Sequence, residues 1–334
     1  MSSLLTPPAV APRGSGLLFA PIAADLAAVE RVYADTVASA KPGLNRLLNH
    51  LDHYRGKRLR PVLLLLTAHA CGRVSQAHHI LGAVVEMVHT ATLVHDDVLD
   101  DAGLRRHVRT VNAGWGNKSS ILLGDYLFTH AFHLSSTTGD ARACEVIGEA
   151  TNRVCEGELH QTLERGNLDL TEDEYLDIID GKTAALTACC CRLGAMYADA
   201  DPDTVERLAN YGRSLGMAFQ VADDLLDLTG QEQTAGKTLG TDLDQLKLTL
   251  PLIHMLEQVP SDEAVRLRGL LSGHSPARRP AITAALEATS AIGYARRKAD
   301  EFAAAARDEL ECLPPTQFRT ILETLTHWSV RRDK

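Results

Sequence analysis

Residues 85–100, VEMVHTATLVHDDVLD, and residues 214–227, SLGMAFQVADDLLD, decide how this chain is interpreted. Each is an apolar stretch that ends in the motif DDxxD. The apolar residues in both stretches follow the spacing of an α-helix rather than the alternation of a strand. Two apolar helices that both end in paired aspartates therefore form the centre of the expected fold.

The same helical periodicity recurs along most of the chain. Helices are expected at residues 22–40, 61–71, 75–100, 119–136, 141–165, 171–197, 204–228, 294–310 and 315–331, and from about residue 242 after a loop at 229–241. We find no convincing alternating strand and no βαβ rhythm. The pattern predicts an all-α protein built as a single large helical bundle over residues 21–334. A mobile tail rich in Ser, Pro and Gly is expected at residues 1–20.

The six motif aspartates suggest a metal site. They are Asp96, Asp97 and Asp100 in the first motif and Asp223, Asp224 and Asp227 in the second. Residues four apart share a helix face, so these like charges repel, and burying them bare is costly. Cations between the two helix ends remove that cost, and carboxylates with substrate phosphates are the ligands that Mg²⁺ prefers. One DDxxD alone is more often a solvated acidic face, but two copies after apolar helices indicate a multi-metal diphosphate site.

Basic residues bracket the two acidic motifs. The set consists of Lys57, Arg60, Arg105, Arg106, Lys182, Lys237 and Lys247. Lys57 and Arg60 are three apart in GKRLRP (56–61), so we expect them on one helix face. Each residue taken singly is more often a solvated surface side chain. Together they offer the arginine forks and lysine charges that a diphosphate requires.

The overall composition excludes several classes of protein. With 34 Lys and Arg against 43 Asp and Glu, the formal charge of −9 argues against a nucleic-acid partner. The 7 cysteines include no CxxC pair, which favours free thiols in a reducing compartment over zinc ligands. No apolar run reaches the length of a membrane span, and no signal peptide is evident. We therefore expect a soluble, cytoplasmic protein.

Residues 89–106, HTATLVHDDVLDDAGLRR, and residues 219–251 resemble the two aspartate-rich regions of the long-chain trans-polyprenyl diphosphate synthases. Four further blocks resemble that family in the same order: GKRLRP (56–61), GDYLF (124–128), GELHQ (157–161) and GKTAAL (181–186). The resemblance covers roughly residues 25–332. It implies a helical bundle of the isoprenoid synthase type around a central cavity.

The resemblance also implies the activity. Such an enzyme condenses an allylic diphosphate with isopentenyl diphosphate, repeatedly and head to tail, into an all-trans polyprenyl diphosphate. Three Mg²⁺ ions per active site and a homodimer are expected. The departing diphosphate is the implied base for the final proton. A long, lipophilic product makes transient membrane contact plausible during its release.

Roles for single residues follow from the same resemblance. The implied direct Mg²⁺ ligands are Asp96, Asp100 and Asp223, with Asp97, Asp224 and Asp227 acting behind them or through water. The isopentenyl diphosphate would be held by Lys57, Arg60, His89 and Arg106, and the allylic diphosphate by Arg105, Lys182, Lys237 and Lys247. Gln220 and Thr183 match positions near the developing allylic cation. Three positions depart from the family pattern without removing a ligand: Arg55, His107 and Leu248.

Product length is expected to depend on the helix that precedes Asp96. Ala91 and Thr92 lie about one turn before the motif, where farnesyl-forming members of the family carry bulky aromatics. Small side chains there would leave the pocket open, so we expect a product longer than farnesyl. Phe128 and Phe132 are candidates for a deeper floor, although a plain core role suits them equally. A geranylgeranyl product is the alternative.

Three more distant interpretations remain open at this stage. A class I terpene cyclase also uses DDxxD, but its second metal motif is normally different and it lacks the cradle at Lys57 and Arg60. An HD-type phosphohydrolase could use His95 and Asp96, but it leaves the second motif unexplained. A non-catalytic partner subunit tends to lose the aspartates, all of which are present here.

Overall fold

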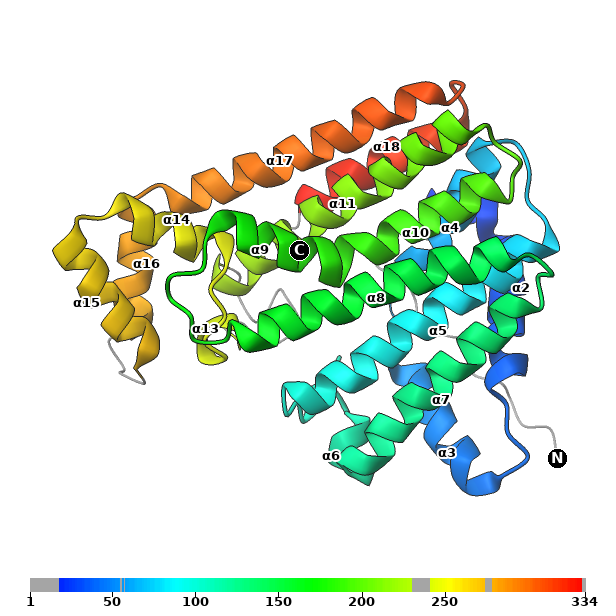
Figure 1. Cartoon of the computed structure of the whole chain (residues 1–334), viewed down its shortest axis with the longest axis horizontal. Coiled ribbons are helices and arrows are strands. Elements are labelled where there is room, and N and C mark those ends of the chain that lie inside the picture. The colour runs from blue at the N-terminus through cyan, green and yellow to red at the C-terminus, as the bar shows by residue number, and fades with distance from the viewer. Residues whose placement is uncertain (1–17, 55, 57, 230–240, 274–277, 332–334) are drawn as a thin grey trace.

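The computed structural model describes residues 18–331 apart from 55, 57, 230–240 and 274–277, and its long helices run side by side (Figure 1). The elements before the second half of the chain are η1 (Ala20–Ile22), α2 (Ala23–Val37), α3 (Pro42–His50), η2 (Leu51–Tyr54), α4 (Leu59–Ala70), α5 (Gln76–Leu99), β1 (Leu104–Arg105), β2 (Val108–Arg109), α6 (Val111–Trp115), α7 (Asn117–Ser136) and α8 (Ala141–Leu163). The remaining elements are α9 (Glu172–Ile179), η3 (Asp180–Ala184), α10 (Ala185–Met196), α11 (Pro202–Thr229), α13 (Thr241–Asp244), α14 (Leu250–Gln258), α15 (Ser261–Ser272), α16 (Arg278–Ala288), α17 (Ala291–Glu309), η4 (Leu310–Cys312) and α18 (Gln317–Val330). The predicted all-α class is confirmed.

One expected helix is interrupted. The periodicity predicted a single helix over residues 171–197, and it does begin with the predicted capping box, in which the Glu174 amide donates to the Thr171 hydroxyl and the Thr171 amide to the Glu174 carboxylate. At Asp180–Ala184, however, the backbone widens into the π-helical turn η3. A one-residue change of register barely alters hydrophobic periodicity, so the sequence pattern did not reveal it.

Two local features were not predicted from the sequence. A two-stranded antiparallel hairpin exists, with Leu104 opposite Arg109 and Arg105 opposite Val108, but its strands are too short to show an alternating pattern. The helix that carries Arg60 begins only at Leu59, because Arg58 has a left-handed backbone with φ of 49°. Arg60 therefore lies in the first turn of α4, and Lys57, which was expected on the same helix face, lies outside the described residues.

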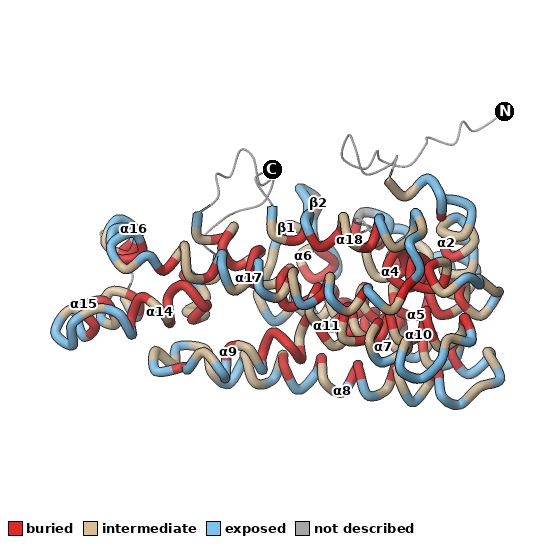
Figure 2. Tube along the Cα trace, turned by 90° about the horizontal axis from the view of Figure 1, so that it is seen from above, coloured by how far each residue is buried: buried red, intermediate tan, exposed pale blue. Residues whose placement is uncertain are grey.

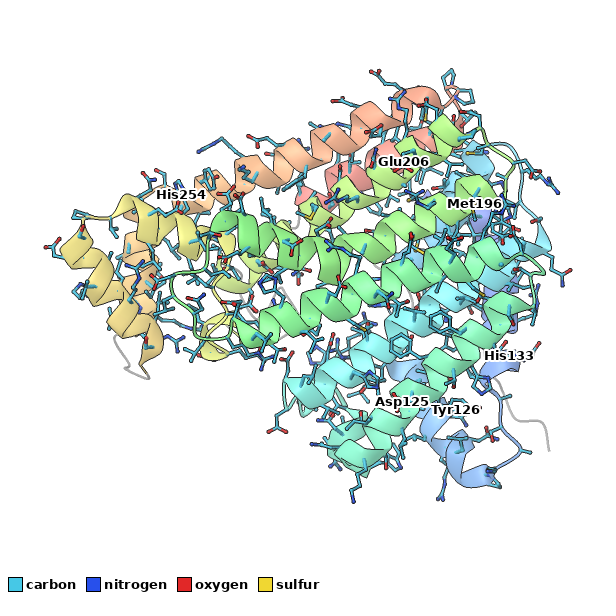
Figure 3. The ribbon with its side chains drawn as sticks, viewed as in Figure 1. Asp125, Tyr126, His133, Met196, Glu206 and His254 are labelled. Carbon is cyan, nitrogen blue, oxygen red and sulfur yellow. The ribbon has the colours of Figure 1, made fainter. Side chains whose placement is uncertain are left out.

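Two hydrophobic cores support the bundle, as the buried segments in Figure 2 show. The larger core is built mainly from α4, α5, α7, α8 and α10, and the smaller from α9, α14, α16 and parts of α11 and α17. Helix α11 places Leu208 in the first core and Val221 in the second, so one continuous helix joins them. At the rim of the second core, His254 of α14 stacks on Tyr294 of α17 with ring centres 3.9 Å apart (Figure 3).

The ends and cysteines agree only partly with expectation. Of the expected tail, residues 1–17 lie outside the described residues, but Leu18 and Phe19 pack against the larger core. All seven cysteines lie in the described part of the chain, and none is paired in a disulfide. Within that same part, we find no helix with both the length and the apolarity needed to span a membrane.

Candidate active site

The first aspartate motif ends helix α5, and its middle residue is engaged by the protein itself. The Asp97 side chain is fully buried. The Tyr54 hydroxyl donates to one carboxylate oxygen of Asp97 at 2.6 Å, and Arg105 Nε donates to the other at 2.9 Å. The side-chain amide of Asn112 also donates to the Asp97 carbonyl at 2.9 Å. With both oxygens occupied, Asp97 orients the end of α5 rather than presenting free ligand oxygens.

Asp96 and Asp100 share the other face of this helix end. Arg165 Nη2 lies 2.6 Å from one oxygen of Asp100, and Lys247 Nζ lies 3.6 Å from the same oxygen. Burial raises the pKa of Asp96 to about 6; Lys182 opposes the shift, and the carboxylates of Glu158 and Asp100 add to it. A carboxylate that is difficult to ionise in the protein alone is one that a cation would stabilise.

The second motif lies at the end of α11, and its middle aspartate is again engaged. The Tyr175 hydroxyl donates to Asp224 at 2.6 Å, and the Gln220 amide donates to its other oxygen at 2.8 Å. Asp227 accepts from the backbone amide of Asp242 at 3.1 Å, while Asp223 is partly exposed. Both motifs thus use one tyrosine hydroxyl to hold the central carboxylate.

Lys182 of the η3 turn interacts with carboxylates of both motifs. Its Nζ lies 2.7 Å from Glu158 and donates to Gln161 at 2.8 Å, both on α8. Burial lowers the pKa of Lys182, but the charges of Glu158 and Asp96 outweigh it and raise the pKa, so the ammonium group stays charged. Burial raises the pKa of Asp224 to about 6, and the Lys182 charge is among the groups that oppose this rise. One ammonium group therefore acts electrostatically on both metal motifs.

Thr183 lies next to Lys182 on the η3 turn and is linked to Asp224 of the second motif by hydrogen bonds through Gln220. Its hydroxyl donates to Gln220 Oε1 at 2.7 Å, and the amide of Gln220 donates to Asp224. The two residues that were expected near the allylic cation are thus hydrogen-bonded to each other.

A second cluster of basic side chains surrounds the beginning of α4. Burial lowers the pKa of His89 well below its usual value, and the charges of Arg60, Arg105 and Arg106 lower it further, so His89 is neutral at pH 7. Arg106 Nη1 donates to the Tyr54 carbonyl at 2.5 Å. Glycine at position 56 leaves room for the Arg106 guanidinium, which a Cβ would overlap.

Arg60 has unused hydrogen-bonding capacity. Burial lowers its pKa, while the carboxylate of Glu86 opposes the shift. Its Nε is buried and has no hydrogen-bond partner in the described part of the chain. A buried guanidinium nitrogen without an acceptor is what an anion-binding site requires before the anion arrives.

For several expected site residues, the structure does not test the expected role. Lys57 and Lys237 lie outside the described residues. Ala91 is fully buried in the larger core, and the Thr92 hydroxyl donates to the His89 carbonyl of its own helix. Phe128 and Phe132 are partly buried against the same core. The structure has a cavity of about 20 Å³ between α2, α4 and α5 and an open groove of about 360 Å³ beside η3. Neither is the expected central cavity between the two aspartate motifs, which stays a prediction.

The structure adds residues that sequence analysis did not single out. Tyr54, Tyr175 and Arg165 contact the motifs from 43, 49 and 65 positions away, so motif spacing could not reveal them. Glu158 and Gln161 lie within the GELHQ block, which was noted without a role for either. In contrast, His95 of the supposed HD dyad contacts the Ile121 carbonyl through Nε2 at 3.1 Å.

The donor set fits Mg²⁺ held jointly with a substrate. Among the described residues, no three His, Cys, Asp or Glu side chains are close enough to hold a metal by themselves. Mg²⁺ usually takes one or two carboxylates and completes its shell with water and phosphate oxygens. Asp96, Asp100 and Asp223 would supply those carboxylates.

Comparisons with known proteins decide the family. A family model described as Polyprenyl synthetase matches residues 41–289. The chain belongs to the polyprenyl synthetase family. The octaprenyl diphosphate synthase of Escherichia coli (strain K12) is 36% identical over 313 residues, which cover 93% of this chain and 97% of that protein.

Solved structures of polyprenyl synthetases agree. A decaprenyl diphosphate synthase from Rhodobacter capsulatus matches with a TM-score of 0.91 and 36% identity over 95% of this chain and 99% of that one. A polyprenyl synthase from Caulobacter crescentus CB15, complexed with calcium and isoprenyl diphosphate, matches with a TM-score of 0.89 and 35% identity over 95% and 97%. The predicted family and enzyme class, a prenyltransferase, are confirmed, so the cyclase and phosphohydrolase interpretations are set aside.

Proposed function

We propose that this protein condenses an allylic diphosphate with isopentenyl diphosphate, repeatedly and with Mg²⁺, into an all-trans polyprenyl diphosphate longer than farnesyl. The observation that carries the proposal is the placement of Lys182, whose Nζ lies 2.7 Å from Glu158 and whose charge acts on Asp96 of the first DDxxD motif and on Asp224 of the second. A single diphosphate bound beside Lys182 can therefore meet the ligands of both motifs. The neutral, half-buried His89 and Arg60, whose Nε has no hydrogen-bond partner in the described part of the chain, supply a second anion site.

The residues of the first site would promote ionisation of the allylic carbon–oxygen bond. Bound Mg²⁺ would neutralise charge that develops on the diphosphate. Lys182 contributes a fixed positive charge to the leaving group, and Arg105, held by Asp97, contributes a second. The hydroxyl oxygen of Thr183 and the side-chain oxygen of Gln220, which are hydrogen-bonded to each other, would face the developing allylic cation, where their dipoles would favour positive charge.

The residues of the second site would position isopentenyl diphosphate. Arg60 and Arg106 offer guanidinium groups, and neutral His89 can donate one hydrogen bond without adding charge. Holding the double bond close to the cation is an effect of proximity and orientation. No side-chain nucleophile is needed.

Product length is the second part of the proposal. The relatives reported above act as octaprenyl and decaprenyl diphosphate synthases, and small residues at 91 and 92 agree with a long product. We expect Ala91→Phe to shorten the product, because a bulky ring one turn before Asp96 would floor the pocket. Product lengths would be compared at equal folded protein, checked by circular dichroism. A folded variant with unchanged product length would contradict the role of Ala91.

A homodimer is the third part. Four large apolar side chains are exposed at the beginning of α7 and near the end of α8: Ile121, Leu122, Leu159 and Leu163, here called the α7–α8 patch. The two helix ends are both tied to α5, by His95 with Ile121 and by Asp100 with Arg165. Helices α7 and α8 lie on the same side of the molecule (Figures 1 and 2). A second copy is the partner that would cover this patch.

One assay tests the reaction. Purified protein is incubated with Mg²⁺, isopentenyl diphosphate and farnesyl diphosphate, and the dephosphorylated products are separated by length. We expect a ladder that extends beyond geranylgeranyl and disappears with EDTA. A stop at geranylgeranyl would favour the shorter-product alternative. No elongation from farnesyl, geranyl or dimethylallyl diphosphate would overturn the proposal and favour a partner-dependent subunit.

A further inference from the structure

The η3 turn is held between two helices at very short backbone distances. A Cβ at Gly157 of α8 would lie 2.6 Å from the Lys182 amide nitrogen, and a Cβ at Gly216 of α11 would lie 2.7 Å from the Ala184 Cα. Glycine at both positions therefore lets the two helices contact the turn directly. The turn closes with a bond from the Ala185 amide to the Asp180 carbonyl, one residue wider than an α-helical bond.

In a π-helical turn, contacts with the neighbouring elements must determine which residue of the segment is the extra one. The wider turn is rare and less stable than an α-helix, and its extra residue can be placed one position earlier or later. A shift by one position would rotate Lys182 and Thr183 away from the motif aspartates. Some contact specific to this register is therefore needed to hold the two side chains in place.

Asp180 makes that contact on the outer side of the turn. Its side chain is only 10% exposed and is bonded by an arginine from each flanking helix. Arg153 Nη2 of α8 donates to one carboxylate oxygen at 3.0 Å, and Arg213 Nε of α11 donates to the other at 2.5 Å. Lys182, two positions later, contacts Glu158 at 2.7 Å instead, and its ammonium charge acts on Asp96 and Asp100 of the first motif.

We infer that Asp180 is a positioning residue, which fixes the η3 turn to α8 through Arg153 and to α11 through Arg213 and so sets where Lys182 and Thr183 meet the allylic diphosphate. Within the described part of the chain, the side-chain hydrogen bonds of Asp180 go to Arg153 and Arg213 and not to the motif aspartates. This inference rests on the proposed role of Lys182 and Thr183.

Asp177 offers a matched control on the preceding turn. It also accepts from Arg153 Nη2, at 3.2 Å, and carries the same charge, but its side chain is 58% exposed and no contact joins it to α11 in the described part of the chain. Asp177→Asn therefore removes a carboxylate from the same arginine without releasing the turn from α11.

The test is steady-state kinetics of the full-length enzyme with each substrate varied in turn. We expect Asp180→Asn to raise the KM for the allylic diphosphate about tenfold and to lower kcat, because small misplacements of a positioning group are costly. The KM for isopentenyl diphosphate should change less than about twofold, since its site is built from α4, α5 and the hairpin. Asp177→Asn should stay within about twofold of wild type in all three constants. A simple loss of folded protein would lower kcat and leave both KM values unchanged.

A second variant and a double mutant complete the test. Arg213→Gln removes only the tie to α11 and should repeat the selective rise in allylic KM; its side chain is 60% exposed, so the variant should fold even if Asp180→Asn does not. In a Lys182→Ala background, Asp180→Asn should have a smaller effect than in wild type, because only its action through Thr183 remains. If Lys182→Ala impairs allylic binding but Asp180→Asn and Arg213→Gln do not, the positioning role is wrong. If Lys182→Ala itself has no effect, the proposed role of Lys182 fails first, and the inference fails with it.

Discussion

At the scale of single residues, Tyr54 connects three parts of the candidate site. Its hydroxyl donates to Asp97 and accepts from the Val111 amide at 3.0 Å, and its carbonyl accepts from Arg106. Burial and the neighbouring Asp97 raise the pKa of Tyr54, so the hydroxyl keeps its proton and remains a donor. The phenol therefore fixes the end of α5 relative to the hairpin and to α6.

Removing that hydroxyl should destabilise the protein measurably. Tyr54→Phe would leave the Val111 amide and one Asp97 oxygen without a partner in a buried site, which costs about 1–3 kcal/mol. Urea unfolding would measure the loss. Tyr126→Phe is the control, because that hydroxyl (Figure 3) makes one bond of 3.3 Å, to the Val37 carbonyl, in a less buried setting. Equal losses of unfolding free energy in the two variants would show that the hydrogen bonds of Tyr54 stabilise the protein no more than the single bond of Tyr126.

His107 is a residue whose replacement should stabilise the protein. It and Arg106 form the two-residue turn of the hairpin, with φ of 65° and 51°, a turn that favours glycine at the second position. The free energy released by removing the left-handed strain should exceed the entropic cost of the more flexible unfolded chain. His107→Gly should therefore raise the free energy of unfolding by about 0.5–1 kcal/mol. Differential scanning calorimetry measures this directly. His107→Ala, which keeps the strain, should show no gain.

Sequence patterns predicted the motif residues but not their partners. Spacing alone places Asp96 beside Asp100, because the helix has a fixed period. The donors to Asp97 and Asp224 come from distant segments that only tertiary packing brings near. The same limit explains why Arg60 was predicted as a diphosphate ligand while its neighbour Glu86 was not.

At the scale of elements, α8 and η3 approach each other closely at Gly157. Gly157→Ala would place a methyl group against the backbone of Lys182. Backbone atoms, unlike the end of a flexible side chain, cannot move aside easily. We expect a loss of about 1–3 kcal/mol in unfolding free energy, together with lower activity, because the turn must shift.

A second glycine on the same helix provides the control for that prediction. Gly148 of α8 has nothing within 4 Å of a Cβ, so Gly148→Ala should raise stability by about 0.5–1 kcal/mol through helix propensity alone. Urea unfolding and activity would be measured for both variants. If Gly157→Ala behaves like Gly148→Ala, the close approach does not constrain the turn.

Helix positions were predicted well and helix interruptions were not. Apolar periodicity identified α5, α8 and α11 within a few residues of their observed ends, because each has one long buried face. It missed the short α3 and α6 and the η3 turn, which carry too few residues for a period to emerge. The interruption that places Lys182 is therefore invisible in the pattern that predicted the helix.

At the scale of the whole molecule, the four large apolar side chains of the α7–α8 patch are exposed to solvent in the single chain. Burying each such side chain contributes about 1.5–3 kcal/mol, so a second copy has a strong reason to cover the patch. The exposed fractions of Leu159 and Leu163, 63% and 81%, are far above those of core residues. They are four positions apart on α8 and so share one face of that helix.

A charged substitution there should separate the subunits. We expect the wild-type protein to show a mass near twice the 36.2 kDa of one chain in light scattering, and Leu159→Glu to show the mass of a single chain, because an unpaired charge buried in an apolar interface is very costly. Val265→Glu on α15 is the control, since Val265 is equally exposed at 70% but lies outside the patch, and its mass should match that of wild type. If Leu159→Glu remains a dimer, the copies meet elsewhere. If wild type is already a monomer that binds lipid vesicles through this patch, the apolar face serves a membrane instead, and the expected homodimer is wrong.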